Sequence, residues 1–304
     1  MGDACREQAR VVRGVRMASC SWGSAAAPAA RTLVCLHGWQ DNAWSFRALG
    51  EAVAASGADW QLTALDLPGH GLSDHLPAAQ FYNLWDYVSL VIDWLRADTG
   101  PVWLCGHSMG GMIASVLAAV RPDLVRGLVT LDMFGLATDD SPTDQVSRLV
   151  RVLREQTEPL AVSRPSPDLA HAVARRQRFG SPATAAANQH LVERGAEETA
   201  TGWVFRLDPR VRLGSVMRLT TEQVIALGGM IHCPWHAILG KQGMFSQRVV
   251  QRGQMHWPQA RVYWWPGNHH FHMESAPEAL WNTMRGLLHA AADELEDNQN
   301  SQGV

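Results

Sequence analysis

One short segment of the sequence suits nucleophilic catalysis, the run Gly-His-Ser-Met-Gly at residues 106–110. It matches the pattern G-x-S-x-G, in which a serine lies on a sharp turn between a strand and a helix. An apolar run at residues 102–105 precedes it, and small and apolar residues at 112–120 follow it. The glycines let strand and helix approach closely, which lifts the serine hydroxyl toward a bound carbonyl. The pattern therefore predicts that Ser108 is a nucleophile for acyl transfer.

A serine on such a turn requires a parallel sheet, and the apolar runs of the chain predict one. Helical patterns lie between short apolar runs that end in glycine or an acidic residue. Strands are expected at residues 11–22 (one or two), 32–36, 61–65, 102–105, 127–131, 236–239 and 262–265, and helices at 84–95 and 112–120. Because strands and helices alternate, the predicted fold class is α/β, with a mostly parallel central sheet and helices on both faces.

A long interval of about a hundred residues separates the strand at 127–131 from the last two strands. Its pattern is mostly helical, with helices predicted at 144–154, 168–178 and 184–194. We interpret the chain as a core of residues 1–134 and 230–290, a mainly helical cap of residues 135–229, and a polar tail of residues 291–304.

The inserted region also has its own charge. Residues 141–220 contain twelve arginines and eight acidic residues, so this region carries +4 and the rest of the chain −7. The excess fits either a solvated arginine-rich surface or a cap that attracts anions. Both interpretations stay open at this stage, as does a role for Arg206 or Arg210 in binding a carboxylate.

The motifs occur in the order found in α/β-hydrolase-fold serine hydrolases, and the chain resembles that superfamily from about residue 30 to 285, apart from most of the cap. The resemblance is carried by H-G-W at 37–39, D-L-P-G-H-G-L-S at 66–73, the serine turn, and P-G-N-H at 266–269. The runs L-H-G-W-Q-D-N at 36–42 and A-T-G at 200–202, with Asp208, Arg210, His272 and Met273, are similar to the serine hydrolase-like subgroup. The resemblance implies an α/β-hydrolase fold with a helical cap insertion and a Ser-His-Asp triad.

In this superfamily the histidine of the triad follows the last strand, and His269 has that position here. The resemblance therefore implies that His269 is the general base. His270 and His272 are its competitors. We expect His272 to pack beside the loop, as the superfamily pattern has a second histidine at this spacing, and we expect His270 to be exposed. His107 is treated as structural.

The acid of the triad departs from the superfamily's usual pattern. Members usually have G-x-x-D after the penultimate strand, whereas residues 240–243 of this chain read G-K-Q-G, so Gly243 stands in the place of the acid. Some members use an aspartate after the preceding strand instead, and Asp132 has that position. We therefore predict Asp132 as the triad acid, which would orient the imidazole and stabilise its protonated form. Asp139 and Asp140 are weaker rivals, and Asp66 is expected to be structural.

The oxyanion hole should be formed by two backbone N–H groups, those of Trp39 and Met109. Trp39 and Trp44 also indicate an apolar acyl pocket. Together these residues predict a carboxylic ester hydrolase that acts on a small to medium hydrophobic ester through an acyl-enzyme. Epoxide hydrolases and haloalkane dehalogenases of this fold need an aspartate in place of Ser108, so both are disfavoured.

Three alternatives remain on the same fold. A cofactor-free dioxygenase would also place its acid after this strand, but it usually has a histidine where this chain has Asp41. A ligand-binding receptor is suggested by the missing usual acid. A C–C bond hydrolase or a lactonase could use the same triad.

Composition excludes several other classes of function. The 304 residues carry a formal net charge of −3, which gives no field for binding nucleic acid. No apolar run approaches the ~18 residues of a membrane span, and no apolar signal core follows the first residues. The five cysteines have neither C-x-x-C spacing nor an even number, so we expect a reducing, cytoplasmic location and no zinc site. No dinucleotide motif is present, and we expect neither a metal nor an organic cofactor, only a small-molecule substrate.

Overall fold

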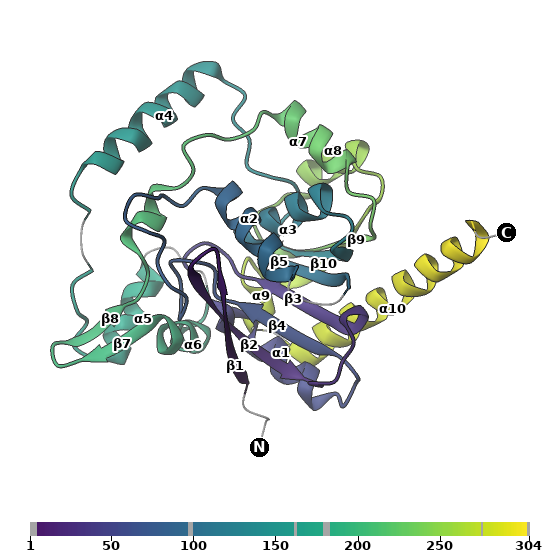
Figure 1. Cartoon of the computed structure of the whole chain (residues 1–304), viewed down its shortest axis with the longest axis horizontal. Coiled ribbons are helices and arrows are strands. Elements are labelled where there is room, and N and C mark those ends of the chain that lie inside the picture. The colour runs from purple at the N-terminus through teal and green to yellow at the C-terminus, as the bar shows by residue number, and fades with distance from the viewer. Residues whose placement is uncertain (1–4, 97–99, 161–162, 179–182, 275, 303–304) are drawn as a thin grey trace.

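A computed structural model of the chain describes residues 5–96, 100–160, 163–178, 183–274 and 276–302. Its centre is an eight-stranded sheet with the order β1-β2-β4-β3-β5-β6-β9-β10 (Figure 1). The strands are β1 (Arg6–Val12), β2 (Val15–Gly23), β3 (Thr32–Leu36), β4 (Gln61–Leu65), β5 (Val102–His107), β6 (Val125–Leu131), β9 (Trp235–Gln242) and β10 (Ala260–Asn268). Strands β4, β3, β5, β6, β9 and β10 are mutually parallel, whereas β2 runs antiparallel to both of its neighbours, β1 and β4. The predicted α/β fold class with a mostly parallel sheet is confirmed.

Helices cover both faces of the sheet, as expected from the alternation of strands and helices. They are α1 (Arg47–Ala55), α2 (Leu84–Leu95), α3 (Met109–Val120), α7 (Thr221–Gly229), α8 (Gln247–His256), α9 (Phe271–Glu274) and α10 (Pro277–Gln302), with short 3-10 turns at Ala29–Arg31 and Ala43–Phe46. One hydrophobic core joins α2, α3, α7 and α8 to the sheet, and a second joins α1, α9 and α10 to the opposite face. None of the helices in the described ranges combines the length and the hydropathy that crossing a bilayer requires.

Helix α2 illustrates how local sequence and packing agree. It starts at Asn83, whose side chain and that of Asp86 form a reciprocal capping box at the first turn. Tyr87, Val91 and Trp94 recur at helical spacing and are buried against the sheet. Each such burial contributes about 1.5–3 kcal/mol to stability. The helix predicted at residues 84–95 is therefore confirmed with its bounds.

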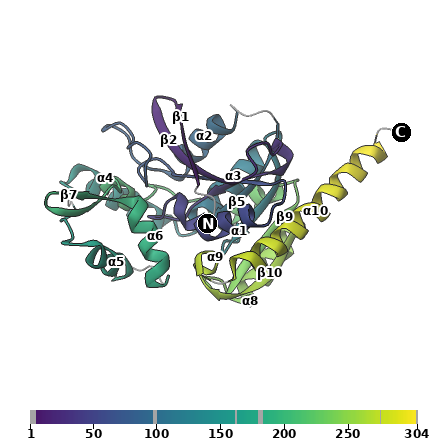
Figure 2. The same cartoon turned by 90° about the horizontal axis from the view of Figure 1, so that it is seen from below.

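The insertion between β6 and β9 folds as a separate lobe beside the sheet (Figure 2). It contains α4 (Pro142–Thr157), α5 (Leu169–Arg178), α6 (Ala185–Gly195), β7 (Ala196–Thr199), β8 (Gly202–Phe205) and the 3-10 turn Pro209–Leu213. The β7–β8 hairpin was not predicted, and α5 and α6 pack on it around a small core of their own. Helix α7, which lies within the predicted cap range, packs instead on α3 of the main domain.

The two ends of the chain bear on two expectations from the sequence. Helix α10 continues through the predicted tail to Gln302 and extends beyond the body of the molecule in both views (Figures 1 and 2). Cys5, directly before β1, is joined by a disulfide to Cys20 of β2. Disulfides are rare in reducing compartments, so this pairing gives no support to the cytoplasmic location, which stays a prediction. Residues 1–4 and 303–304 lie outside the described part of the chain.

Candidate active site

Ser108 lies on a strained turn between β5 and α3, as the motif predicted. Its backbone has a φ of 50° and a ψ of −119°, a conformation that residues other than glycine seldom adopt. The turn has no room for a side chain at either of the neighbouring glycines. A Cβ on Gly106 would lie 2.3 Å from the Gly110 carbonyl oxygen, and a Cβ on Gly110 would lie 2.0 Å from the carbonyl oxygen of Leu36. The turn therefore depends on close contact between backbones.

Two backbone N–H groups near Ser108 are free to bind an anion. Met109 begins helix α3, so its N–H lies at the positive end of the helix dipole. Trp39 lies on the loop after β3, and its indole donates a hydrogen bond to the Val211 carbonyl at 3.0 Å. Within the described residues, neither the Met109 amide nor the Trp39 amide donates a hydrogen bond to another group.

Asp132 and His269, which are 137 positions apart in the sequence, are hydrogen-bonded. His269 Nδ1 lies 2.6 Å from Asp132 Oδ2. The carboxylate is fully buried and also accepts hydrogen bonds from the backbone amides of Gly240 and Met244, each at 2.9 Å. Burial acts to raise the pKa of Asp132, but the hydrogen bonds from His269 and from these amides outweigh it and hold the pKa below its ordinary value. The residue also has a positive φ of 43°, a strained backbone of the kind concentrated at functional sites.

Gly243, which stands where the superfamily usually has its acid, leaves room for the Asp132 carboxylate. A Cβ built on Gly243 would lie 2.1 Å from Asp132 Oδ1. The two positions therefore compete for the same space beside His269, and a side chain at one excludes the carboxylate at the other.

The rival carboxylates are engaged elsewhere. Asp139 forms an ion pair with Arg148 at 3.3 Å, and Asp140 accepts hydrogen bonds from Thr221. Asp66 is fully buried and pairs with Arg194 of α6 at 3.0 Å, which ties the insertion to the core.

The prediction that His270 is exposed is wrong. His270 is only 6% exposed, and its Nε2 lies 3.7 Å from Asp41 Oδ2. His107 approaches the same carboxylate oxygen with its Nδ1, at 3.6 Å, and burial lowers the pKa of His107 to about 4. His272 is buried beside the loop, as predicted, with its ring centroid 4.2 Å from that of His107. A single loop position carries no periodic signal, so the sequence could not show that His270 turns inward.

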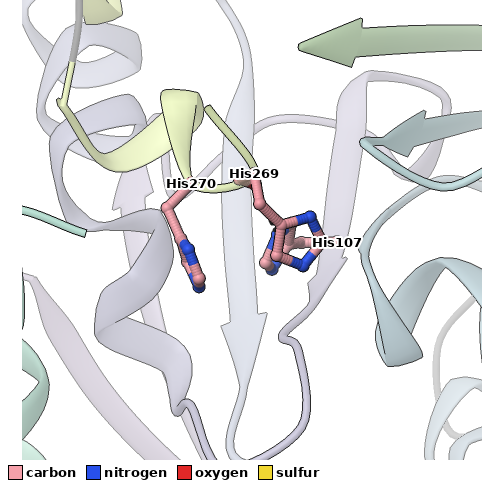
Figure 3. A group of neighbouring side chains, drawn as sticks. All are labelled: His107, His269 and His270. Carbon is pink, nitrogen blue, oxygen red and sulfur yellow. Dashed lines mark hydrogen bonds between the residues drawn. The ribbon is translucent and has the colours of Figure 1, made fainter. Parts of the chain in front are cut away.

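Figure 3 shows His269 and His270 on one loop, with the His107 ring beside that of His269. The three histidines offer nitrogen atoms within 4.8 Å of one another, which is close enough to share a metal ion. However, His269 Nδ1 is hydrogen-bonded to Asp132, and His107 Nε2 lies 2.9 Å from the His269 carbonyl oxygen. These two nitrogens already have protein partners, and the three rings also pack against one another, with centroids 4.6 to 5.0 Å apart.

Ser108 and His269 line one pocket of about 830 Å³, within the range of small-molecule sites. The Ser108 hydroxyl makes no hydrogen bond to His269 or to any other described residue, so it is free to rotate. Trp39, Leu191, Phe205 and Leu207 supply apolar surface. Trp44, expected beside them, does not line the pocket and packs instead under Arg47.

The sequence did not reveal which arginines reach the pocket. Arg206 and Arg210, left open as carboxylate binders, are paired with Glu197 and Asp208 at 3.0 and 2.6 Å. The lining arginines all come from the insertion and are Arg164, Arg175, Arg176, Arg178 and Arg212. The excess positive charge of the insertion was the available signal, but it could not identify the residues.

Comparison with known proteins agrees with this fold. The family described as alpha/beta hydrolase fold matches residues 31–181. A serine hydrolase-like protein of Danio rerio is 27% identical over 287 residues, covering 89% of this chain and 85% of the relative. A serine hydrolase-like protein of Dictyostelium discoideum is 29% identical over 282 residues, covering 86% of this chain and 76% of the relative. The thioesterase domain from the curacin biosynthetic pathway superposes with a TM-score of 0.83 at 24% identity, covering 93% of this chain and 100% of that domain.

The chain therefore has the α/β-hydrolase fold. It is a hydrolase of that fold and is similar to the serine hydrolase-like proteins, as the sequence motifs indicated.

Proposed function

We propose that this protein is a serine hydrolase that cleaves carboxylic esters with a Ser108-His269-Asp132 triad. The observation that carries the proposal is the 2.6 Å hydrogen bond between Asp132 and His269 at a pocket that Ser108 also lines. The strained turn at Ser108 and the free amides of Trp39 and Met109 support the same chemistry.

In the proposed reaction, Ser108 Oγ attacks the ester carbonyl carbon while His269 Nε2 accepts the hydroxyl proton. The amides of Trp39 and Met109 bind the oxyanion of the tetrahedral intermediate. His269 then returns the proton to the departing alcohol, which leaves an acyl ester on Ser108. Water, deprotonated by His269, hydrolyses that ester and releases the carboxylic acid and the free serine. Asp132 fixes the imidazole with Nδ1–H toward the carboxylate throughout.

The apolar part of the lining supports an ester of small to medium size with an apolar segment. The indole of Trp39 is half exposed at the pocket, and Leu191, Phe205 and Leu207 lie on the insertion. Covering apolar substrate surface of this kind favours binding by about 25 cal/mol per Å². We also propose that the insertion acts as a cap, because it supplies one wall of the pocket.

The first test is labelling with a fluorophosphonate probe, together with turnover of 4-nitrophenyl acetate and butyrate. Wild type and a Ser24→Ala control, which changes a serine remote from the pocket, should both be labelled and active. Ser108→Ala should lose labelling and all turnover above the spontaneous rate. Labelling that persists in Ser108→Ala, or wild type that is neither labelled nor active, would overturn the proposal and favour the dioxygenase or receptor alternatives.

A further inference from the structure

The pocket has an unbalanced charge. Five arginines of the insertion line it. Among the described residues, Asp41 is the only acidic residue that lines it. Asp41 is occupied, because its carboxylate is ion-paired with the Arg176 guanidinium. The other four arginines therefore face the pocket without a lining carboxylate to neutralise them.

Arg175 is held in place without an acidic partner. Its guanidinium donates hydrogen bonds to the Arg164 carbonyl and to Ser163 Oγ, and it lies 5.1 Å from the centroid of the Phe205 ring. Stacking on an aromatic ring and bonding to neutral oxygens orient a guanidinium but leave its charge in place. Arg175 is half-buried, so water compensates this charge only in part.

Arg212 adds a second positive charge close to the first. In the described part of the chain its side chain has neither a hydrogen bond nor an ion pair. Burial, followed by the positive charge of Arg212, lowers the pKa of Arg175. Two like charges directed at one pocket repel each other, and an anion bound between them would relieve that repulsion.

Most arginines elsewhere in the insertion have an acidic partner. Arg194, Arg206 and Arg210 each have a carboxylate partner, at 3.0 Å or closer. A general excess of arginine in the composition would not sort the residues in this way. Among the described residues, four of the five lining arginines have no ion pair, whereas outside the pocket only two of the insertion's seven arginines, Arg154 and Arg218, have none.

We propose that the substrate ester carries a free carboxylate, bound by Arg175 and Arg212, on the part of the molecule that extends from Ser108 into the insertion. The inference rests on the proposed function and refines it, since the substrate would combine an apolar segment with an anionic end. Guanidinium groups suit this task because they donate two parallel hydrogen bonds to a carboxylate.

The test compares two 4-nitrophenyl esters of the same shape, the monoester of glutaric acid and the ester of 5-methylhexanoic acid, in which an isopropyl group replaces the carboxylate. Wild type should prefer the glutarate monoester in kcat/KM by about tenfold, and added salt should reduce the preference. Arg175→Gln and Arg212→Gln should each reduce the ratio of the two kcat/KM values by about tenfold. Arg248→Gln, which alters an exposed arginine of α8 outside the pocket, should leave the ratio as in wild type.

A binding measurement separates failure of this inference from failure of the proposed function. Calorimetric titration of Ser108→Ala with monomethyl glutarate and with dimethyl glutarate should show tighter binding of the anion, and Arg175→Gln should remove the difference. Labelling at Ser108 with equal turnover and equal binding of charged and neutral compounds would overturn the inference alone. Absence of labelling with arginine-dependent binding of monomethyl glutarate would overturn the hydrolase and keep anion recognition. Competition by inorganic phosphate but not by glutarate would overturn the carboxylate assignment.

Discussion

Two buried aspartates lie near the pocket, and each faces a histidine, but their environments differ. Asp132 is 2.6 Å from His269 and receives its other hydrogen bonds from neutral amides of the β9 end. Asp41 is 3.6 and 3.7 Å from His107 and His270, beyond hydrogen-bond distance, and it pairs with Arg176. Burial opposes ionisation of Asp41, but these histidines and the guanidinium outweigh it and hold its pKa well below the ordinary value.

The difference shows what makes a buried carboxylate suitable for orienting a histidine. A cation as close as Arg176 takes up most of the carboxylate's charge, so little of it is left for an imidazole. Neutral amides fix Asp132 without cancelling its charge, and this charge can stabilise the imidazolium that forms on His269. We therefore propose that Asp132 serves catalysis and that Asp41 attaches the insertion to the core.

The largest expected effect is a difference in activity between variants of the two aspartates. Asp132→Asn should lower kcat for 4-nitrophenyl butyrate by about 10⁴, because an amide favours the wrong imidazole tautomer. Asp41→Asn should lose far less activity, since it leaves the His269 hydrogen bond intact. Steady-state kinetics at pH 8 measure both variants, and losses of equal size would remove the distinction.

The second prediction concerns stability. Asp41→Asn should lower the free energy of unfolding by about 3 kcal/mol, because it leaves the Arg176 guanidinium largely buried without its counter-charge. The double variant Asp41→Asn/Arg176→Met should recover most of that loss. Urea unfolding of the three proteins tests this, and a double variant less stable than Asp41→Asn would show that the ion pair does not explain the loss.

The histidine beside Asp41 should make the protein sensitive to acid. Burial lowers the pKa of His107 to about 4, from the ordinary value of 6.5, so between these pH values the unfolded chain binds a proton that the folded chain does not. The free energy of unfolding is then highest above about pH 6.5 and falls as the pH decreases. His107 alone lowers it by about 2 kcal/mol at pH 5.

Urea unfolding at pH 8 and pH 5, compared between wild type and His107→Gln, isolates this contribution. The glutamine variant should show a smaller decrease between the two pH values, whatever its stability at pH 8. An unchanged decrease would mean that other buried histidines dominate the acid response. Burial also lowers the pKa of His37 and His236 to about 4, that of His70 to about 3, and that of His272 well below its ordinary value.

The smallest expected effect is a relocation of the acid. Asp132→Ala/Gly243→Asp moves the carboxylate to the superfamily's usual position, into space that the Asp132 side chain occupies. The double variant should be about tenfold more active than Asp132→Ala, because one carboxylate again reaches His269. Gly243→Asp alone should be impaired, since the two carboxylates would overlap. Equal activity of the double variant and Asp132→Ala would show that position 243 cannot orient His269.

The strands and the serine turn could be predicted because their signals are local. The strands at 32–36 and 61–65 have the predicted bounds, since each is a short apolar run closed by polar or glycine residues. The β7–β8 hairpin was missed because β7 has only four residues, of which Glu197, Glu198 and Thr199 are exposed. Its strands are fixed by packing of α5 and α6, which leaves no apolar alternation in the sequence.

The sequence by itself determined the α/β-hydrolase fold, the strained turn at Ser108, and Asp132 and His269 as candidates for its partners. Only the tertiary structure decided that Asp132 and His269 are hydrogen-bonded, that His270 is buried, and which arginines stay unpaired beside the pocket. Backbone conformation depends on neighbouring residues, whereas Coulomb and hydrogen-bond energies depend on distances between side chains far apart in the chain. Those distances exist only after the insertion has docked on the sheet.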